Sequence, residues 1–431
     1  MTRIELCLTS DQVEQSDADE VLLWDGTAND SFKTGLRPSL EQLGSVPTEN
    51  ADFVRLALAV YTADHTVRRE RGGSNWNERD IELIVPVVHV EQWQEIASDF
   101  AHSLDFLTGD RWTLSFVPLP PGVATVTSAL VLDPAERTVL VSGGADSASG
   151  ALVSAATLPE RQAHRLVSHS SSGSGASAPQ NRVVDALKRY YPSATAHHYQ
   201  IHLQRKSRRL DGTRFRNEPS SRSRSLLFLG LGLAVASQSG RGLWIAENGF
   251  ASINPPLGPE RIGALSTRTT QPWFLWRVGE HLRKVGGFGT IENPFQTLTK
   301  GEEYRQVAEL LGPDEASAFL SATNSCSHSD QQYLGDVASG TPCGTCFGCT
   351  LRRAAFAASD LEDQTPYLSE RGGKYEEYAH QRSIDTAVRD FVATGIDESF
   401  LMTTPLPPNL ALSAVKSLYQ RGLDELEGYL S

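Results

Sequence analysis

The chain of 431 residues contains no apolar run long enough to cross a bilayer. Its most apolar stretch, Leu226 to Ala236, is too short for a transmembrane helix and predicts a buried helix instead. The first residues lack the apolar core and the small-residue cleavage site of a secretory signal. We therefore expect a cytoplasmic protein that makes no membrane contact.

The sequence also lacks an excess of positive charge. It has 39 Lys and Arg residues against 52 Asp and Glu residues, a formal net charge of −13. Such a chain repels phosphate backbones, so general nucleic-acid binding is not expected. One segment is different, because residues 204–225 carry eight basic side chains against Asp211 and Glu218. This basic segment is either a solvated loop or a lid over a polyphosphate.

Cysteines are few and unevenly placed. There are five, and four of them fall within 24 residues. An odd number in a large cytosolic chain argues against a disulfide framework and for a metal site. Four thiolates suit a closed, structural Zn²⁺ site, and an iron–sulfur cluster is the alternative. The predicted ligands are Cys326, Cys343, Cys346 and Cys349, whereas Cys7 is expected in a core.

Patterning divides the chain into three predicted units, residues 1–130, 131–358 and 359–431. In the middle unit, strands expected at 138–142, 164–170, 194–203 and 242–248 alternate with helices at 147–158, 181–191 and 225–238. This alternation predicts βαβ units and a parallel sheet. The first unit is expected to be α+β, with strands at 4–10, 21–26, 81–90 and 112–119 and a helix at 90–107. Segment 51–67 fits either a strand pair or a short buried element, and the last unit is expected to be a helical tail.

Between an expected strand and an expected helix lies Ser-Gly-Gly-Ala-Asp-Ser at 142–147. The two glycines allow backbone angles that other residues avoid, and they let a ligand approach closely. Free amides and the dipole at a helix start favour an anion. An acid beside an anion indicates Mg²⁺, which takes carboxylate and phosphate oxygens. An ordinary tight turn is the alternative to this predicted phosphate-binding loop, whose residues are Ser142, Gly143, Gly144, Ala145, Asp146 and Ser147.

The loop resembles the SGGxDS loop of the PP-loop ATP pyrophosphatases rather than other glycine-rich nucleotide motifs. Within that group, three further segments resemble 7-cyano-7-deazaguanine synthases. They are Thr323–Cys326 together with Cys343–Phe356, the segment 293–302 with Lys300, and the segment 222–236 with Arg224. The resemblance covers about residues 138–358. It implies an α/β, Rossmann-like PP-loop domain of the adenine nucleotide α-hydrolase type, with Asp146, Lys300 and Arg224 as catalytic residues.

The chain also departs from this family pattern. The spacer of 16 residues between Cys326 and Cys343 is longer than usual, and Ser225 stands where the family has asparagine. Residues 1–130 have no counterpart in the housekeeping synthases. Such an extension resembles the synthase-like proteins of antiphage operons of the Qat and type IV CBASS kind. In that branch, the resemblance implies that a deazaguanine is joined to a protein amine.

The implied reaction is ATP-dependent ligation. Adenylation of 7-carboxy-7-deazaguanine releases pyrophosphate, and an amine, here the N-terminus of a partner protein, then forms an amide. A nitrile synthase that uses ammonia is the first alternative. A tRNA thiolase of the same superfamily is the second, and the acidic balance argues against it. A degenerate nucleotide-binding scaffold is the third. A homodimer is compatible with the sequence.

Two smaller groups of residues have competing interpretations. The histidines at 164, 169, 197, 198 and 202 alternate within expected strands, which favours strand-face histidines over a second metal site. The aromatic residues of 271–278 fit helix packing better than stacking on a flat heterocycle.

Overall fold

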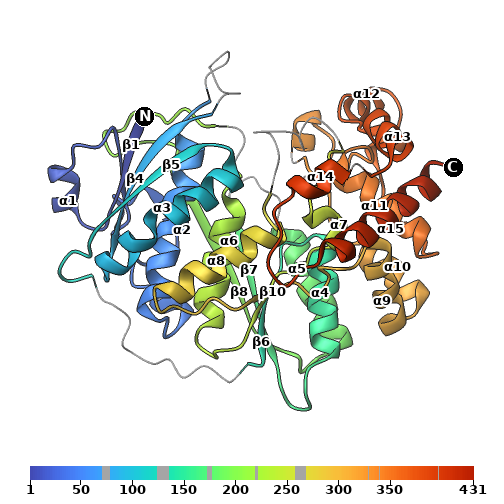
Figure 1. The fold of residues 1–431 in the computed structure, drawn as a ribbon, viewed down its shortest axis with the longest axis horizontal. Helices are drawn as coiled ribbons and strands as arrows, with labels where there is room; N and C mark the ends of the chain where they lie inside the picture. The colour runs from blue at the N-terminus through green and yellow to red at the C-terminus, as the bar shows by residue number, and fades with distance from the viewer. Residues whose placement is uncertain are drawn as a thin grey trace.

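The computed structural model describes residues 1–69, 78–123, 135–171, 177–218, 222–257, 268–328, 330–338, 340–396 and 398–431. Two β-sheets organise these residues (Figure 1). The first sheet has the strand order β2-β1-β4-β5, and the second has the order β10-β9-β6-β7-β8-β3. Neighbouring strands run parallel, with the exception of β3, which pairs antiparallel with β8.

The strands are β1 (Thr2–Cys7), β2 (Glu20–Leu23), β3 (Phe32–Thr34), β4 (Asp80–Val87), β5 (Arg111–Pro118), β6 (Arg137–Leu140), β7 (His164–Ser170), β8 (Thr195–Arg205), β9 (Leu243–Trp244) and β10 (Ile291–Glu292). The helices are α1 (Ser10–Gln15), α2 (Thr48–Thr66), α3 (Val90–Thr108), α4 (Ala145–Ala156), α5 (Ser177–Tyr190), α6 (Arg224–Ala236), α7 (Gly249–Ser252), α8 (Pro272–Lys284), α9 (Lys300–Leu311), α10 (Pro313–Ser321), α11 (Phe347–Ala358), α12 (Lys374–His380), α13 (Asp385–Thr394), α14 (Glu398–Thr403) and α15 (Leu412–Leu430). This is the predicted α/β class, with a parallel-sheet domain and a helical C-terminal region.

Segment 51–67 belongs to a single helix, α2, and not to a strand pair. Fifteen consecutive residues of α2, from Asn50 to Asp64, are buried. A helix buried on every side carries no polar stripe, so its period of 3.6 residues is not visible in the sequence. The short strands β3 and β10 were not expected either, since two or three residues leave no pattern to recognise.

The second sheet reverses its strand order beside β6. From β6 the chain passes through α4, β7 and α5 to β8, and then returns through α6 to β9 on the other side of β6. Such a reversal opens a crevice at the carboxyl ends of the two diverging strands, and ligands of open α/β sheets bind there. The loops that follow β6 and β9 border this crevice, so they are the places to look for a site.

The N-terminal residues pack directly on the second sheet. Strand β3 forms its edge beside β8, and Gly230 of α6 would bring an added Cβ within 3.1 Å of Ala57 in α2. One continuous hydrophobic core joins the first sheet, α2, α6 and α8. The division of the chain at residues 130 and 358 stays a prediction.

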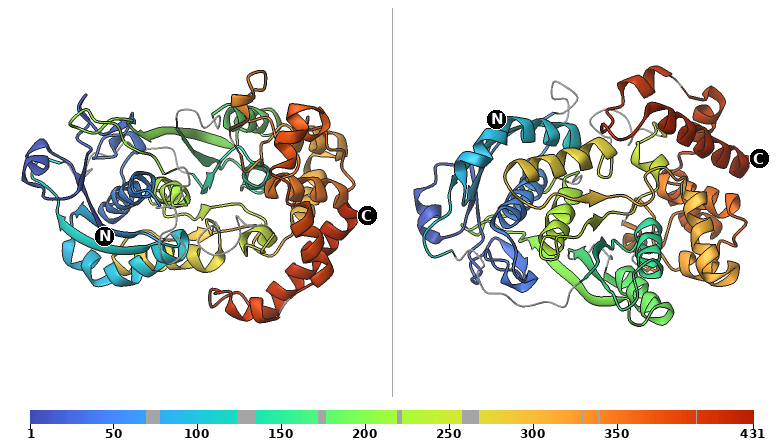
Figure 2. Two further views of the ribbon diagram at one scale, coloured as in Figure 1. Left: turned by 90° about the horizontal axis from the view of Figure 1, so that it is seen from above. Right: turned by 60° about the horizontal axis from the view of Figure 1, so that its bottom comes forward.

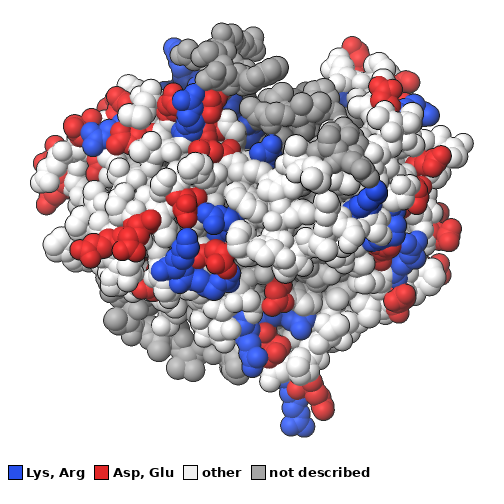
Figure 3. All heavy atoms as spheres, viewed as in Figure 1, with Lys and Arg blue, Asp and Glu red and all other residues white. Residues whose placement is uncertain are grey.

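The C-terminal helices lie on the other side of the second sheet from the N-terminal sheet, and Figures 1 and 2 agree on this arrangement. Their own core includes Val415, Leu418 and Tyr419 of α15 packed with Phe250 of α7 and Leu351 of α11. None of the described helices is long and apolar enough to cross a membrane. Figure 3 shows positive and negative side chains interspersed on the face seen in Figure 1.

Candidate functional site

The predicted nucleotide loop closes tightly between β6 and α4. Gly143 has φ of 90°, and a Cβ there would lie 2.8 Å from the Pro179 side chain, so only glycine fits. The Ser147 hydroxyl donates to the carbonyl oxygen of Gly144 at 3.0 Å, and the Ser142 amide donates to Ser147 Oγ at 3.1 Å. Ser147 is buried and stabilises the turn, whereas Ser142 is exposed.

The acid of this loop has a cationic partner. Asp146 Oδ2 accepts a hydrogen bond from Lys300 Nζ, and these side chains are only 14% and 6% exposed. Burial acts to raise the pKa of Asp146, but the Lys300 ammonium and hydrogen bonds from its neighbours hold it well below its usual range. Asp146 in turn raises the pKa of Lys300 against the effect of burial. The two groups are therefore a charged pair at neutral pH.

Lys300 is the first residue of α9, and its position is set by a capping box. The Thr299 side chain accepts from the Glu302 amide, and the Glu302 carboxylate accepts from the Thr299 amide. This reciprocal arrangement satisfies two free amides at the helix start. The capping box thus gives a local structural reason for the Thr-Lys-Gly-Glu sequence at 299–302. Next in the chain, Glu303 is fully buried, and burial together with the Asp146 charge raises its pKa well above its usual range.

Asn248 completes the surroundings of Asp146, and the sequence analysis missed it. Its backbone amide and its side-chain Nδ2 donate to Asp146 Oδ1 at 3.1 and 2.8 Å, while its Oδ1 accepts from the Ala251 amide and caps α7. It is the last residue of the expected strand 242–248. A polar residue at the end of an apolar strand was the available indication.

The four predicted cysteine ligands come together. Their sulfur atoms all lie within 4.8 Å of one another, with 3.8 Å between Cys326 and Cys346 and 3.9 Å between Cys343 and Cys349. Tetrahedral Zn²⁺ with bonds of about 2.3 Å places its sulfurs about 3.8 Å apart, so the four residues fit this metal. Among the described residues, no other group of three histidine, cysteine or acidic side chains converges in this way. The histidines at 164, 169, 197, 198 and 202 lie in strands β7 and β8.

Two glycines make the cysteine cluster compact. Gly344 has φ of 93°, and a Cβ on Gly348 would lie 1.9 Å from the carbonyl oxygen of Ser325. Cys346 is the N-cap of α11, so the helix start faces the cluster. Free amides at a helix start favour negative charge, which suits thiolate ligands.

The segment that carries Cys326 also braces the nucleotide loop. The Asn324 amide donates to the Gly143 carbonyl oxygen at 3.0 Å, and the Ala145 amide donates to Ser325 Oγ at 3.4 Å. A pocket of about 260 Å³ lies between them, and its wall includes Ser142, Gly144, Asp146, Glu247, Asn248, Lys300 and residues 324–327. Asp146 and Glu247 supply carboxylates of the kind that Mg²⁺ takes together with phosphate oxygens.

Not every predicted site residue lines this pocket. Gly143, Ala145 and Ser147 form the turn behind it. Arg224 does not line it. This guanidinium lies 5.9 Å from the ring centre of Phe228, and its charge contributes, after burial, to lowering the pKa of His169 to about 4. In the basic segment, Arg209 pairs with Glu20 at 2.9 Å. That segment is thus attached in part to the N-terminal unit.

The remaining interpretations concern packing. Trp273 of α8 contacts Phe106 with 4.8 Å between ring centres, and Phe274 is buried. Both support helix packing for this aromatic group. Cys7 is fully buried, and burial raises its pKa to about 12, as expected of a core thiol.

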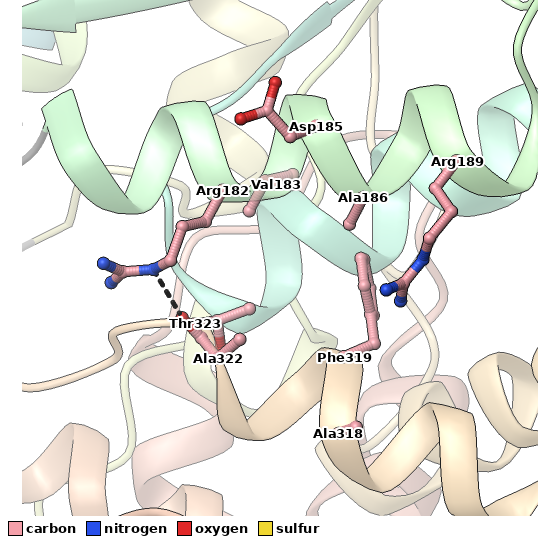
Figure 4. A pocket seen from close by; sticks show the side chains of 9 residues that line it. All are labelled: Arg182, Val183, Asp185, Ala186, Arg189, Ala318, Phe319, Ala322 and Thr323. Atoms are coloured by element: carbon pink, nitrogen blue, oxygen red, sulfur yellow. Dashed lines mark hydrogen bonds between the residues drawn. The ribbon is translucent and has the colours of Figure 1, made fainter.

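A second hollow, of about 410 Å³, lies between α5 and α10 (Figure 4). Arg182 and Arg189 of α5 flank it, and Arg182 Nε donates to the carbonyl oxygen of Ala322 at 3.3 Å. None of the predicted nucleotide-loop or metal residues lines it. It is therefore separate from the candidate site.

Comparisons with known proteins point to one family. A 7-cyano-7-deazaguanine synthase of Novosphingobium aromaticivorans is 33% identical over 147 residues, which are 34% of this chain and 54% of that protein. Synthases of Ralstonia nicotianae and Nitrosospira multiformis are 30% and 33% identical over 147 and 150 residues, covering 34% of this chain and 57% and 55% of those proteins. No family model matches the chain. The chain spans about half the length of the curated relatives it matches, and over a third of its own length it is similar to 7-cyano-7-deazaguanine synthases.

Proposed function

We propose that this protein is an ATP-dependent enzyme that adenylates 7-carboxy-7-deazaguanine, releases pyrophosphate and forms an amide. The observation that carries the proposal is the pocket at the sheet reversal. There the glycine loop, the Asp146–Lys300 pair and the cysteine-bearing segment meet. The similarity to 7-cyano-7-deazaguanine synthases supports the same reaction class.

The residues of the pocket suit transfer of an adenylyl group. A carboxylate is a poor electrophile, because oxide would have to leave. A substrate carboxylate oxygen attacks the α-phosphorus of ATP, the bond to the bridging oxygen breaks, and pyrophosphate leaves. An amine nitrogen then attacks the acyl carbon and AMP departs, with one proton lost from the amine. Lys300 would neutralise phosphate charge while Asp146 and Asn248 hold it in place. Mg²⁺, held by Asp146 or Glu247, would supply further charge for the leaving pyrophosphate.

The acceptor that we propose is the N-terminal amine of a partner protein in antiphage defence, in the cytoplasm. Ammonia needs only a narrow channel, whereas a macromolecular acceptor needs a docking surface of about 800 Å² on each partner. Residues 1–69 and 78–123 provide folded surface outside the segment 138–358, which carries the motifs that resemble the synthases. A flexible chain end reaches a crevice more easily than a lysine on a helix does.

The test of the reaction is product analysis with purified protein, ATP, Mg²⁺ and 7-carboxy-7-deazaguanine. AMP and pyrophosphate are expected. Lys300→Ala should abolish both products, whereas Lys284→Ala, at an exposed lysine paired with Asp99, should leave them unchanged. Formation of ADP and phosphate by the unaltered protein would contradict the proposal.

The acceptor needs its own experiment. Incubation with ATP, Mg²⁺, the carboxy-deazaguanine and the products of neighbouring genes should add the mass of the deazaguanine acyl group to one partner. If ammonia instead yields free nitrile and no protein gains mass, the enzyme is a nitrile synthase and the protein-acceptor proposal is wrong.

A further inference from the structure

The C-terminal helix α15 reaches the turn that presents Lys300. Glu425 of α15 accepts a hydrogen bond from the Thr299 hydroxyl and one from the Gly301 amide, the latter at 3.1 Å. Thr299 and Gly301 flank Lys300, so both neighbours of this lysine are attached to one carboxylate. The approach is close, because a Cβ on Gly301 would lie 2.4 Å from Glu425 Oε1.

A second side chain of α15 holds the same turn. Arg421 Nε donates to Glu302 Oε1 at 2.8 Å, and Arg421 Nη2 donates to the Thr297 carbonyl oxygen at 2.6 Å. Glu302 is the acid of the capping box, so Arg421 orients the group that fixes the start of α9. With a further bond from Arg421 Nη2 to Glu302 Oε2 at 3.4 Å, one turn of α15 makes five hydrogen bonds to residues 297–302.

The same helix also packs behind Asn248. A Cβ on Gly422 would lie 2.3 Å from the ring of Phe250, and a Cβ on Gly249 would lie 2.7 Å from Leu418. Gly249 and Phe250 begin α7, which Asn248 caps. Lys300 and Asn248, both hydrogen-bonded to Asp146, are therefore backed by one helix from outside the expected PP-loop unit.

We propose that α15 holds the Lys300 turn of the candidate site in place, and that its Glu425 and Arg421 are positioning residues for Lys300. The helix would restrict the Lys300 turn to the conformation in which the ammonium meets Asp146 and faces the pocket. This inference deepens the proposed function and rests on it for the role of Lys300 toward phosphate. The mechanical part, that Glu425 restrains Lys300, can be measured without any catalysis.

The first experiment measures the accessibility of Lys300 in the full-length protein by competitive acetylation with acetic anhydride and peptide mass spectrometry. Lys300 is 5% exposed and should react slowly. Glu425→Ala removes the acceptor of two hydrogen bonds, so acetylation of Lys300 relative to exposed Lys284 should rise about tenfold. Asp424→Asn changes the adjacent exposed acid, which bonds only to Gln420 among the described residues, and should leave the ratio unchanged.

Glu425→Gln is the control that separates the loss of these hydrogen bonds from misfolding as the cause of faster acetylation. Its carbonyl oxygen can still accept from Gly301 and its amide can donate to the Thr299 hydroxyl, so Lys300 should stay protected to within about threefold. If Lys300 reacts equally in Glu425→Ala and the unaltered protein, the inference is overturned, whatever the product analysis gives. If the glutamine and alanine variants expose Lys300 equally, hydrogen bonding by Glu425 is not the restraint and the inference also falls.

A double-mutant cycle links the restraint to turnover. Glu425→Ala should lower pyrophosphate formation about tenfold when Lys300 is present, and should have no further effect on the residual rate of Lys300→Ala. An equal loss in both backgrounds would show a general structural role and would contradict the positioning of Lys300. If the unaltered protein forms no pyrophosphate, the proposed function fails, and acetylation still decides the restraint.

Discussion

At the scale of single residues, the two carboxylate oxygens of Asp146 have different hydrogen-bond partners. Asp146 Oδ1 accepts hydrogen bonds from the backbone amide and the side chain of Asn248, and Asp146 Oδ2 accepts one from Lys300 Nζ. The Asp146 carboxylate thus fixes the position of the Lys300 ammonium group. Because Lys300 balances its charge, an acid in this loop is compatible with the predicted phosphate site.

Asp146→Asn should lower AMP and pyrophosphate formation by at least about a hundredfold, because it leaves the Lys300 ammonium without its counter-charge and turns a donor toward it. The fold should persist, since asparagine has nearly the same shape. Rapid-quench product analysis beside circular dichroism would measure both effects. Asp185→Asn, at an exposed acid of α5, is the matched control, and a comparable loss in that variant would refute the specific role of Asp146.

His164 provides a residue-scale prediction about pH. It is fully buried between Ser154 and Thr195, with hydrogen bonds of 2.9 and 3.0 Å, and burial lowers its pKa to about 3. An unfolded histidine titrates near pH 6.5, so between these values the unfolded chain binds more protons. The contribution of neutral, buried His164 to the free energy of unfolding is therefore fully present above about pH 6.5. It decreases on acidification by up to about 1.4 kcal/mol per pH unit.

Urea unfolding from about pH 7 to about pH 5 should therefore show a steeper loss of stability in the unaltered protein than in His164→Gln. The variant should be the less stable of the two at neutral pH, because glutamine cannot satisfy both hydroxyl partners equally well. Parallel pH dependences in the two proteins would mean that His164 does not titrate differently on folding.

At the scale of elements, helix α11 links the four-cysteine cluster to the predicted nucleotide loop. Its N-cap is Cys346, and Gly348 lies under the Ser325 carbonyl group. Ser325 Oγ in turn accepts a hydrogen bond from the Ala145 amide at the start of α4. A change in the geometry of the cysteine cluster is therefore expected to alter the conformation of the loop through the short segment that carries Ser325 and Cys326.

Zinc analysis should find close to one ion per chain, and Cys346→Ser should lower both zinc content and thermal stability. Gly348→Ala should do the same without removing a ligand, because its methyl group must displace Ser325 and with it Cys326. Gly428→Ala, in α15 with no atom within 4 Å of the added Cβ, is the control and should retain zinc. Full zinc occupancy in Gly348→Ala would contradict this coupling, and a brown protein would indicate iron–sulfur.

At the scale of the whole molecule, an acid of the N-terminal unit caps a helix of the central one. Asp64 of α2 accepts from the amides of Arg222 and Ser223 at 2.8 and 3.0 Å, directly before α6 begins at Arg224. Its other oxygen accepts from Arg79 at 2.5 Å. Burial opposes ionisation, but Arg79 and Ser223 lower the pKa of Asp64, so the buried carboxylate is charged. An acid of the N-terminal residues thus satisfies two backbone amides at the start of α6.

Asp64→Asn should destabilise the protein by about 3 kcal/mol or more, since it leaves part of a buried ionic network uncompensated. Denaturant unfolding would measure the loss, with the exposed Asp390→Asn as the matched change. A stability equal to that control would show that the contact between Asp64 and the start of α6 contributes little.

Local spacing was enough to predict much of this protein. The order of residues 142–147 between a strand and a helix, the three cysteines of 343–349 and the alternation of strands and helices all act over a few residues. Steric and ligand geometry at that range depend little on the rest of the chain. The α/β class, the loop and the four-cysteine cluster were therefore accessible from the sequence.

Only the tertiary structure decided which distant residues meet. Asp146 is 102 residues from Asn248 and 154 from Lys300, and their meeting depends on the reversal of strand order beside β6. Glu425 reaches Thr299 across 126 residues, and Asp64 reaches the start of α6 across 158. Such contacts follow from how sheets and helices stack, and a buried helix such as α2 leaves no pattern from which to infer them. The sequence determined the kinds of groups present, and the packing decided which of them act together.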